Sequence, residues 1–187
     1  MEPRSRARFV TLLQSGFFCK AVQGQTLFSF LISLPGFTRE YIANRLQTIF
    51  LNGDSVDDTE LAFSGSSATL ALSAAMPGLA GSLFRKCSPL TALRKTAVQG
   101  ALSSSAAPVA VQVKLFNVIA VEKGGELLAG GVVVNRDDLL SFLELRPSLV
   151  TAIKTLTFDK IPVSPAELSN YLEPWSKILL ICNSTDA

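Results

Sequence analysis

The run FRKCSPL, residues 84–90, places Cys87 directly after two cationic side chains. Arg85 and Lys86 would lower the pKa of a neighbouring thiol and favour the thiolate, which is the nucleophilic form. The chain contains no histidine, so a Cys-His or Ser-His-Asp site within it is excluded. We therefore expect no catalytic residue. A thiol-dependent enzyme that uses Cys87 stays an alternative whose base is unidentified.

The other cysteines, Cys19 and Cys182, are far from Cys87 along the chain. Three cysteines at such spacings match neither a metal-ligand motif nor a disulfide framework. For each of them, burial as a small hydrophobic side chain is the favoured interpretation. Reduced thiols are typical of cytosolic proteins, so we predict a cytoplasmic location.

A second group of chemically active residues is the acidic stretch DSVDDTE, residues 54–60. Its carboxylates could supply oxygen ligands to a hard cation. Their spacing does not match the EF-hand loop, and Asp and Asn side chains also stabilise chain reversals by bonding to nearby backbone N–H groups. We therefore predict that this stretch turns the chain and that the protein holds no metal and no cofactor.

The middle of the chain is locally basic, because residues 61–121 contain no Asp or Glu. Arg85, Lys86, Arg94 and Lys95 lie in this span. If they share one surface, they form an anion-binding site for a phosphate ligand, a nucleic acid or an acidic protein. The net charge of +2 is too small to indicate nucleic acid by itself, and no glycine-rich phosphate loop is present. An ordinary solvated face is favoured, and anion binding stays as an alternative.

The elements that must position these residues follow from the apolar pattern. TLFSFLISL alternates with a period of two, which predicts a strand with Phe28, Phe30, Ile32 and Leu34 on its buried face. Thr38 is placed to cap a short helix that would pack on this face. The expected order is strand 17–22, strand 27–34, helix 38–47, strand 48–51 and strand 68–74, with turns at Gly24 and at Asn52-Gly53.

This β-β-α-β-β order, together with the passage FLNGDSVDDTELAFSGSSATLALSAAMPGLAG, resembles a ubiquitin-like β-grasp module. The passage is similar to that of the sulfur-carrier proteins of molybdopterin and thiamine synthesis, over residues 17–81. It also suggests membership of an uncharacterised bacterial protein family. The resemblance implies a β-grasp fold and a functional glycine tail, whose terminal Gly-Gly carboxylate carries sulfur in those proteins.

The glycine tail of this chain differs from that pattern. Gly78 and Gly81 lie in mid-chain and neither belongs to a Gly-Gly pair. We therefore interpret Met76, Pro77, Gly78, Leu79 and Gly81 as an interaction loop, and a sulfur carrier stays as an alternative.

The second half of the chain predicts a separate α+β domain of unassigned fold. QGALSSSAAP, residues 99–108, is small and polar and is predicted to link a first domain, 1–98, to a second, 109–187. Strand 109–122 and strand 127–135 would form a hairpin around Gly124-Gly125, with a bulge at Gly130-Gly131. Helices are expected over 136–145, 147–156 and from Ser164, followed by a final strand ending at Cys182.

The composition favours a globular, noncatalytic protein. With 48% apolar and 17% charged residues the chain can form a core, and no apolar run approaches the ~20 residues that span a bilayer. We therefore predict a soluble α+β protein that acts as a protein-interaction module built on a β-grasp domain. A protein partner is expected, nucleic acid is disfavoured, no membrane is involved, and the sequence indicates neither the partner nor the oligomeric state.

Overall fold

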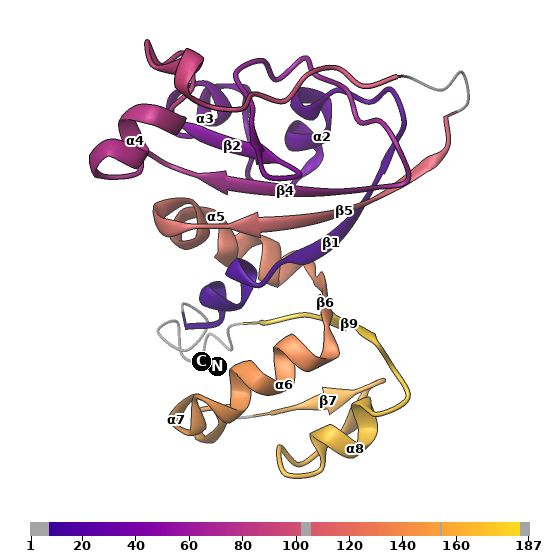
Figure 1. Ribbon diagram of the computed structural model, residues 1–187. Coiled ribbons are helices and arrows are strands. Elements are labelled where there is room, and N and C mark those ends of the chain that lie inside the picture. The colour runs from indigo at the N-terminus through magenta and orange to yellow at the C-terminus, as the bar shows by residue number, and fades with distance from the viewer. Residues whose placement is uncertain (1–7, 102–105, 154, 184–187) are drawn as a thin grey trace.

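The structure is a computed structural model that describes residues 8–101, 106–153 and 155–183. It is an α+β fold whose helices and strands are labelled in Figure 1. The helical elements are η1 (Val10–Gln14), α2 (Leu27–Ser33), α3 (Arg39–Asn44), α4 (Gly78–Phe84), η2 (Thr91–Leu93), α5 (Asn117–Gly130), α6 (Arg136–Glu144), α7 (Pro147–Thr151) and α8 (Leu168–Leu172). The strands are β1 (Phe17–Val22), β2 (Thr48–Leu51), β3 (Asp54–Ser55), β4 (Ser67–Ser73), β5 (Pro108–Leu115), β6 (Val132–Asn135), β7 (Thr157–Phe158), β8 (Ile161–Pro162) and β9 (Lys177–Leu180).

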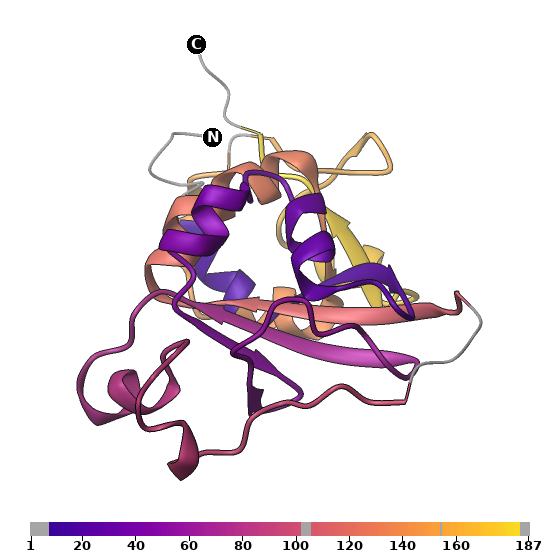
Figure 2. The ribbon, with the colours of Figure 1, turned by 90° about the horizontal axis from the view of Figure 1, so that it is seen from above.

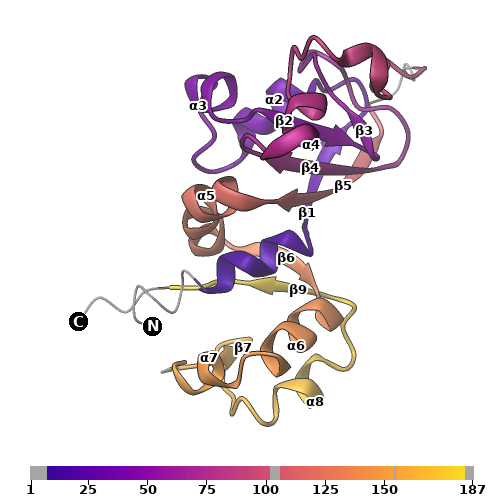
Figure 3. The same cartoon turned by 60° about the vertical axis from the view of Figure 1, so that its left-hand side comes forward.

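A mixed seven-stranded sheet organises the molecule, with strand order β3-β2-β4-β5-β1-β6-β9. Only the β4–β5 pair is parallel, and the other neighbours in this sheet are antiparallel. The short β7–β8 hairpin is separate. Helices α6, α7 and α8 lie at the β6–β9 end of the sheet, away from α2 and α3 (Figures 1 and 3).

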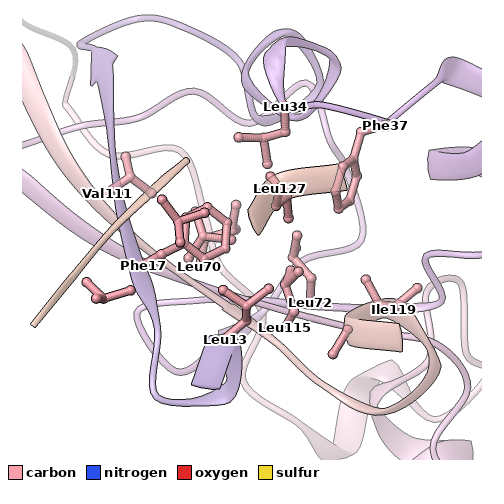
Figure 4. Packing of buried hydrophobic residues seen from close by; sticks show 14 of the residues in the cluster. Leu13, Phe17, Leu34, Phe37, Leu70, Leu72, Val111, Leu115, Ile119 and Leu127 are labelled. Carbon is pink, nitrogen blue, oxygen red and sulfur yellow. The ribbon is translucent and has the colours of Figure 1, made fainter. Parts of the chain in front are cut away.

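One face of the sheet is buried under η1, α2, α3 and α5. Strand β5 contributes every second residue to this core, and the register places these side chains beside those of β4 and β1. Apolar side chains from η1, from α5 and from the segment between α2 and α3 lie over them (Figure 4). The members labelled in that view are Leu13, Phe17, Leu34, Phe37, Leu70, Leu72, Val111, Leu115, Ile119 and Leu127.

The predicted second strand, 27–34, is wrong, because Leu27–Ser33 forms helix α2. The buried residues Leu27, Phe30, Leu31 and Leu34 follow helical spacing, i, i+3, i+4 and i+7. The hydroxyl of Thr26 caps the helix by accepting the Ser29 N–H at 3.1 Å. After η1 the elements therefore run β-α-α-β, and no hairpin forms between β1 and residues 27–34.

The elements predicted next along the chain are confirmed. Helix α3 begins after Thr38, whose hydroxyl accepts the Tyr41 N–H at 3.1 Å. Ile42 in this helix and Leu46 just after it are buried, so the segment packs on the core. Strands β2 and β4 also occur where expected, and Asn52 and Gly53 adopt positive φ in the turn after β2.

The predicted hairpin around Gly124-Gly125 is also wrong. The strand over Pro108–Leu115 is present as β5, but Asn117–Gly130 forms helix α5. Gly124 is buried where α5 crosses η1, and a Cβ atom built there would lie 2.7 Å from Val10 Cγ1. The predicted bulge is instead the end of the helix, where Gly131 has φ 94°. Glycine at position 124 thus permits the close contact between α5 and η1. Glycine at position 131 permits the positive φ at which α5 ends.

We expect Gly124→Ala to destabilise the protein by about 1 kcal/mol, even though alanine favours helix. The added methyl group would meet the stiff, β-branched side chain of Val10. Gly130→Ala is the control, because a Cβ at this last position of α5 meets only Pro35 Cγ at 4.0 Å. Urea unfolding of both variants measures the effect, and a Gly124→Ala protein as stable as Gly130→Ala would contradict this packing.

The C-terminal helices are present as expected, but their bounds differ from those predicted. α6 and α7 begin at Arg136 and Pro147 as predicted, and β9 is the expected final strand. The helix expected from Ser164 begins only at Leu168, since the Ser164 hydroxyl first accepts the Ala166 N–H in a turn.

The sheet crosses the boundary that the sequence predicts between two domains. β5 lies between β4 and β1, and a single hydrophobic cluster contains buried residues from both halves. The segment predicted as a linker, 99–108, therefore leads into the central strand of this sheet; its residues 102–105 lie outside the described part of the chain.

Candidate functional site

The segment between β4 and β5 carries the predicted interaction loop, the four predicted cations and Cys87. Its helix α4 packs on β2, where the Phe84 and Phe50 ring centroids are 5.1 Å apart. Farther along, the Ala97 N–H donates to the Ser55 carbonyl at 2.7 Å, so this chain segment lines the outer side of β3. Figure 2 shows α4 and η2 on the opposite side of β2 from α2 and α3.

A surface hollow of about 490 Å³ lies at the end of α4. We call it the Cys87 hollow, and its lining residues are Gln47, Ser82, Arg85, Lys86, Cys87, Ser88, Pro89 and Leu90. It brings together three of the residues predicted from the sequence: Arg85, Lys86 and Cys87.

The two cations of the Cys87 hollow already have protein acceptors. Arg85 Nε donates to Gln47 Oε1 at 3.1 Å, and Lys86 Nζ donates to the Ile42 carbonyl at 3.0 Å. Burial lowers the pKa of Lys86, and a smaller effect of Cys87 opposes this shift. Lys86 thus helps to cap α3, and no acceptor for the terminal nitrogens of Arg85 is found among the described residues.

Cys87 is exposed, which corrects the prediction that each cysteine is buried. Its backbone has φ 55°, and its N–H donates to Asp57 Oδ1 at 3.2 Å. Cys182 is buried as predicted, and Cys19 is partly buried. Burial raises the pKa of the Cys19 thiol to about 11, which keeps it protonated at neutral pH.

Arg94 belongs to the interior of this segment. Its side chain is only 1% exposed, and its guanidinium forms an ion pair with Asp57. Nη1 also donates to the carbonyls of Leu83 and Arg85, at 2.9 and 3.2 Å. Lys95 is exposed and pairs with Asp54 at 2.8 Å. The four predicted cations therefore do not share one anion-binding surface.

The acidic stretch stabilises a turn, as the sequence predicts, and it also forms ion pairs with the basic segment. Asp58 Oδ1 accepts the Glu60 N–H at 2.8 Å, which stabilises the turn. Asp54 and Asp57 instead hold the basic segment through their ion pairs. In the part of the chain that the structure describes, no three His, Cys, Asp or Glu side chains gather as a metal site.

The predicted interaction loop is the start of α4. Gly78 has φ 67°, and a Cβ atom on the buried Gly81 would lie 1.7 Å from the Met76 carbonyl oxygen. Leu79, by contrast, is 77% exposed. Gly81 therefore packs against the backbone of Met76, and Leu79 presents a large apolar side chain to solvent.

A second surface was missed by the sequence reasoning, and we call it the β9 patch. It lies on the sheet face opposite the core and comprises Phe18, Lys20, Val133, Lys177, Leu179 and Ile181. Val133 lies between Phe18 and Leu179 across β1, β6 and β9. Lys177 Nζ is 3.8 Å from the Phe18 ring centroid. Leu179 and Ile181 are 62% and 51% exposed.

The segments FFCKAV and KILLIC are each predicted as strands, but the sequence does not predict that only β6 separates them. Their proximity follows from nonlocal pairing, which single strands do not encode.

Comparisons of the chain with family models, with curated proteins and with solved structures gave no match. Among the helices of residues 8–101, 106–153 and 155–183, none combines the length and apolar character that crossing a bilayer requires.

Proposed function

We propose that this protein is a noncatalytic interaction module that binds an extended segment of a partner protein along β9. The observation that carries this proposal is the unpaired outer side of β9. Within the described residues β9 is an edge strand of the seven-stranded sheet and pairs with β6 alone. Backbone N–H and C=O groups on such an edge can hydrogen-bond to an added strand.

The other edge of the sheet is occupied differently. Beside β3, the Ser55 N–H donates to the Lys95 carbonyl at 3.2 Å, and Ser55 accepts from Ala97. This edge is therefore covered by the chain itself, which leaves β9 as the side available to a partner.

The side chains beside β9 indicate what the partner segment contains. Leu179 and Ile181 offer apolar contacts, and Lys20 and Lys177 supply positive charge on the same face. Strands β1, β5, β6 and β9 contain no Asp or Glu. We infer a partner segment whose residues i, i+2 and i+4 include both apolar and acidic side chains, since every second side chain of an added strand points to the same face and would meet the apolar and the lysine side chains there.

The alternative functions have less support from the geometry. A β-grasp fold has a second strand at the position where this chain forms α2. The interaction proposal therefore rests on β9 and not on the resemblance to β-grasp proteins. A sulfur carrier needs an extended glycine tail, whereas Gly81 is buried inside α4. Anion binding through the basic middle would use Arg94 and Lys95, which pair with Asp57 and Asp54.

The double variant Leu179→Glu/Ile181→Glu tests the proposal. A phage-displayed library of unstructured peptides selected on the wild-type protein should enrich sequences in which both apolar and acidic residues occur at positions i, i+2 and i+4. We expect the double variant to lose at least ~10-fold in affinity for an enriched peptide, because the new carboxylates remove apolar contact and repel the acidic side chains. Hydrogen exchange should show new protection of the β9 amides in the wild-type complex.

Leu145→Glu is the matched control, because Leu145 is 79% exposed at the end of α6 and lies outside the patch. Thermal unfolding checks that the variants fold. The proposal fails if the selected peptides bind the double variant as well as wild type, or if no peptide is enriched. Sedimentation at twice the chain mass, abolished by the double variant, would instead assign β9 to a second copy of this chain.

A further inference from the structure

A second, smaller hollow lies between η1 and α7, in a part of the molecule that the β9 patch does not include. Its volume is about 230 Å³, and it is lined by Arg8, Thr11, Arg146, Ser148 and Leu149. We call it the Arg146 hollow. Two arginines and a serine with an exposed side chain face the same concave surface.

Arg146 is held in place by its neighbours. Its Nη1 donates to the Phe142 carbonyl at 3.2 Å, and its guanidinium carbon lies 4.1 Å from the centroid of the Phe142 ring. Phe142 is itself buried and packs on Phe9, with ring centroids 5.5 Å apart. These contacts orient the planar guanidinium, so that little side-chain entropy remains to be lost when Nε and Nη2 bind a ligand.

Among the described residues, no carboxylate neutralises the positive charge of this hollow. Neither Arg8 nor Arg146 forms an ion pair with a carboxylate in the described residues. The Thr11 hydroxyl is engaged, because it donates to the Arg8 carbonyl at 3.0 Å. Ser148 makes no such side-chain bond in the described structure and can donate its hydroxyl to a bound anion.

We propose that the Arg146 hollow binds a phosphate dianion, either free or as the terminal group of a small phosphate ester. Arginine matches the oxygens of phosphate with paired N–H donors, and two arginines balance a double negative charge. The volume of about 230 Å³ is below the ~300 Å³ at which pockets for drug-sized ligands begin, so the bound group is small.

Titration of the full chain with inorganic phosphate, followed by calorimetry, tests this site. Chloride at equal ionic strength corrects for screening. We expect saturable binding that Arg146→Lys weakens at least ~10-fold, because lysine keeps the charge but loses the paired donors. Ser148→Asp should abolish binding by placing a carboxylate in the hollow. Ser148 is exposed, so this variant should keep the fold.

Arg85→Lys is the matched control, since Arg85 lines the Cys87 hollow and not this one. The proposal is overturned if phosphate has no effect beyond that of chloride, or if Arg85→Lys weakens binding and Arg146→Lys does not. A parallel arm measures cosedimentation with phosphatidylcholine vesicles that contain phosphatidic acid. Binding that depends on Arg146 in the vesicle arm identifies a lipid phosphate, and binding only in solution identifies a soluble one; both support the site.

Discussion

Replacing Leu31 with alanine is expected to lower the free energy of unfolding by about 3 kcal/mol. Leu31 is fully buried in α2 and belongs to the central hydrophobic cluster. Removing three carbon atoms there leaves a cavity that the neighbouring strands and helices fill only in part. Equilibrium urea unfolding, monitored by circular dichroism, measures the loss.

Ile32→Ala is the control for this prediction, because Ile32 is the next residue and is 41% exposed. We expect a change within about 0.5 kcal/mol for this variant. A strand over residues 27–34 would bury Ile32 and expose Leu31, and so would reverse the order of the two effects. A larger loss for Ile32→Ala than for Leu31→Ala would therefore contradict helix α2.

Asp57→Ala should destabilise the protein by a similar amount, about 3 kcal/mol. The carboxylate of Asp57 is the partner of the buried Arg94 guanidinium. Removing it leaves a positive charge that is 1% exposed and has only carbonyl acceptors, those of Leu83 and Arg85. An unpaired charge in such a place costs more than the pair itself contributes.

The reverse change, Arg94→Met, should cost only about 1 kcal/mol. Methionine fills much of the same space, and the Asp57 side chain, which is 27% exposed, can be hydrated. The double variant Asp57→Ala/Arg94→Met should consequently be more stable than Asp57→Ala alone. If the two losses simply add, the ion pair does not hold the segment between β4 and β5 in the way described.

The sequence predicted several local elements well. Its two wrong elements have a common cause, because each local pattern fits two different structures. TLFSFLISL satisfies a period of two and a helical spacing together, since Leu27, Phe30, Leu31 and Leu34 are all apolar. Thr26, which is placed to cap a helix, could have distinguished the helix from the strand. Segment 117–130 was misread because its glycine pair is typical of a turn, whereas Gly124 serves helix contact.

The candidate sites were harder to predict than the elements. Arg85, Lys86 and Cys87 line one hollow, as neighbours in the sequence readily can. Arg94 was not separated from them, because its burial depends on Asp57, which lies far away in the sequence. The β9 patch and the Arg146 hollow each join distant segments, and only the three-dimensional packing reveals them.

The position of β1 has a consequence for how the chain is made on the ribosome. This strand pairs with β5 and β6, and Phe17 lies opposite Val113. β1 therefore has no strand to pair with until residues 108–115 have been synthesised, and its apolar side chains cannot be buried in the sheet before then. A fragment that stops before β5 would leave the apolar side chains of β1 and β4 without the strand that lies between them.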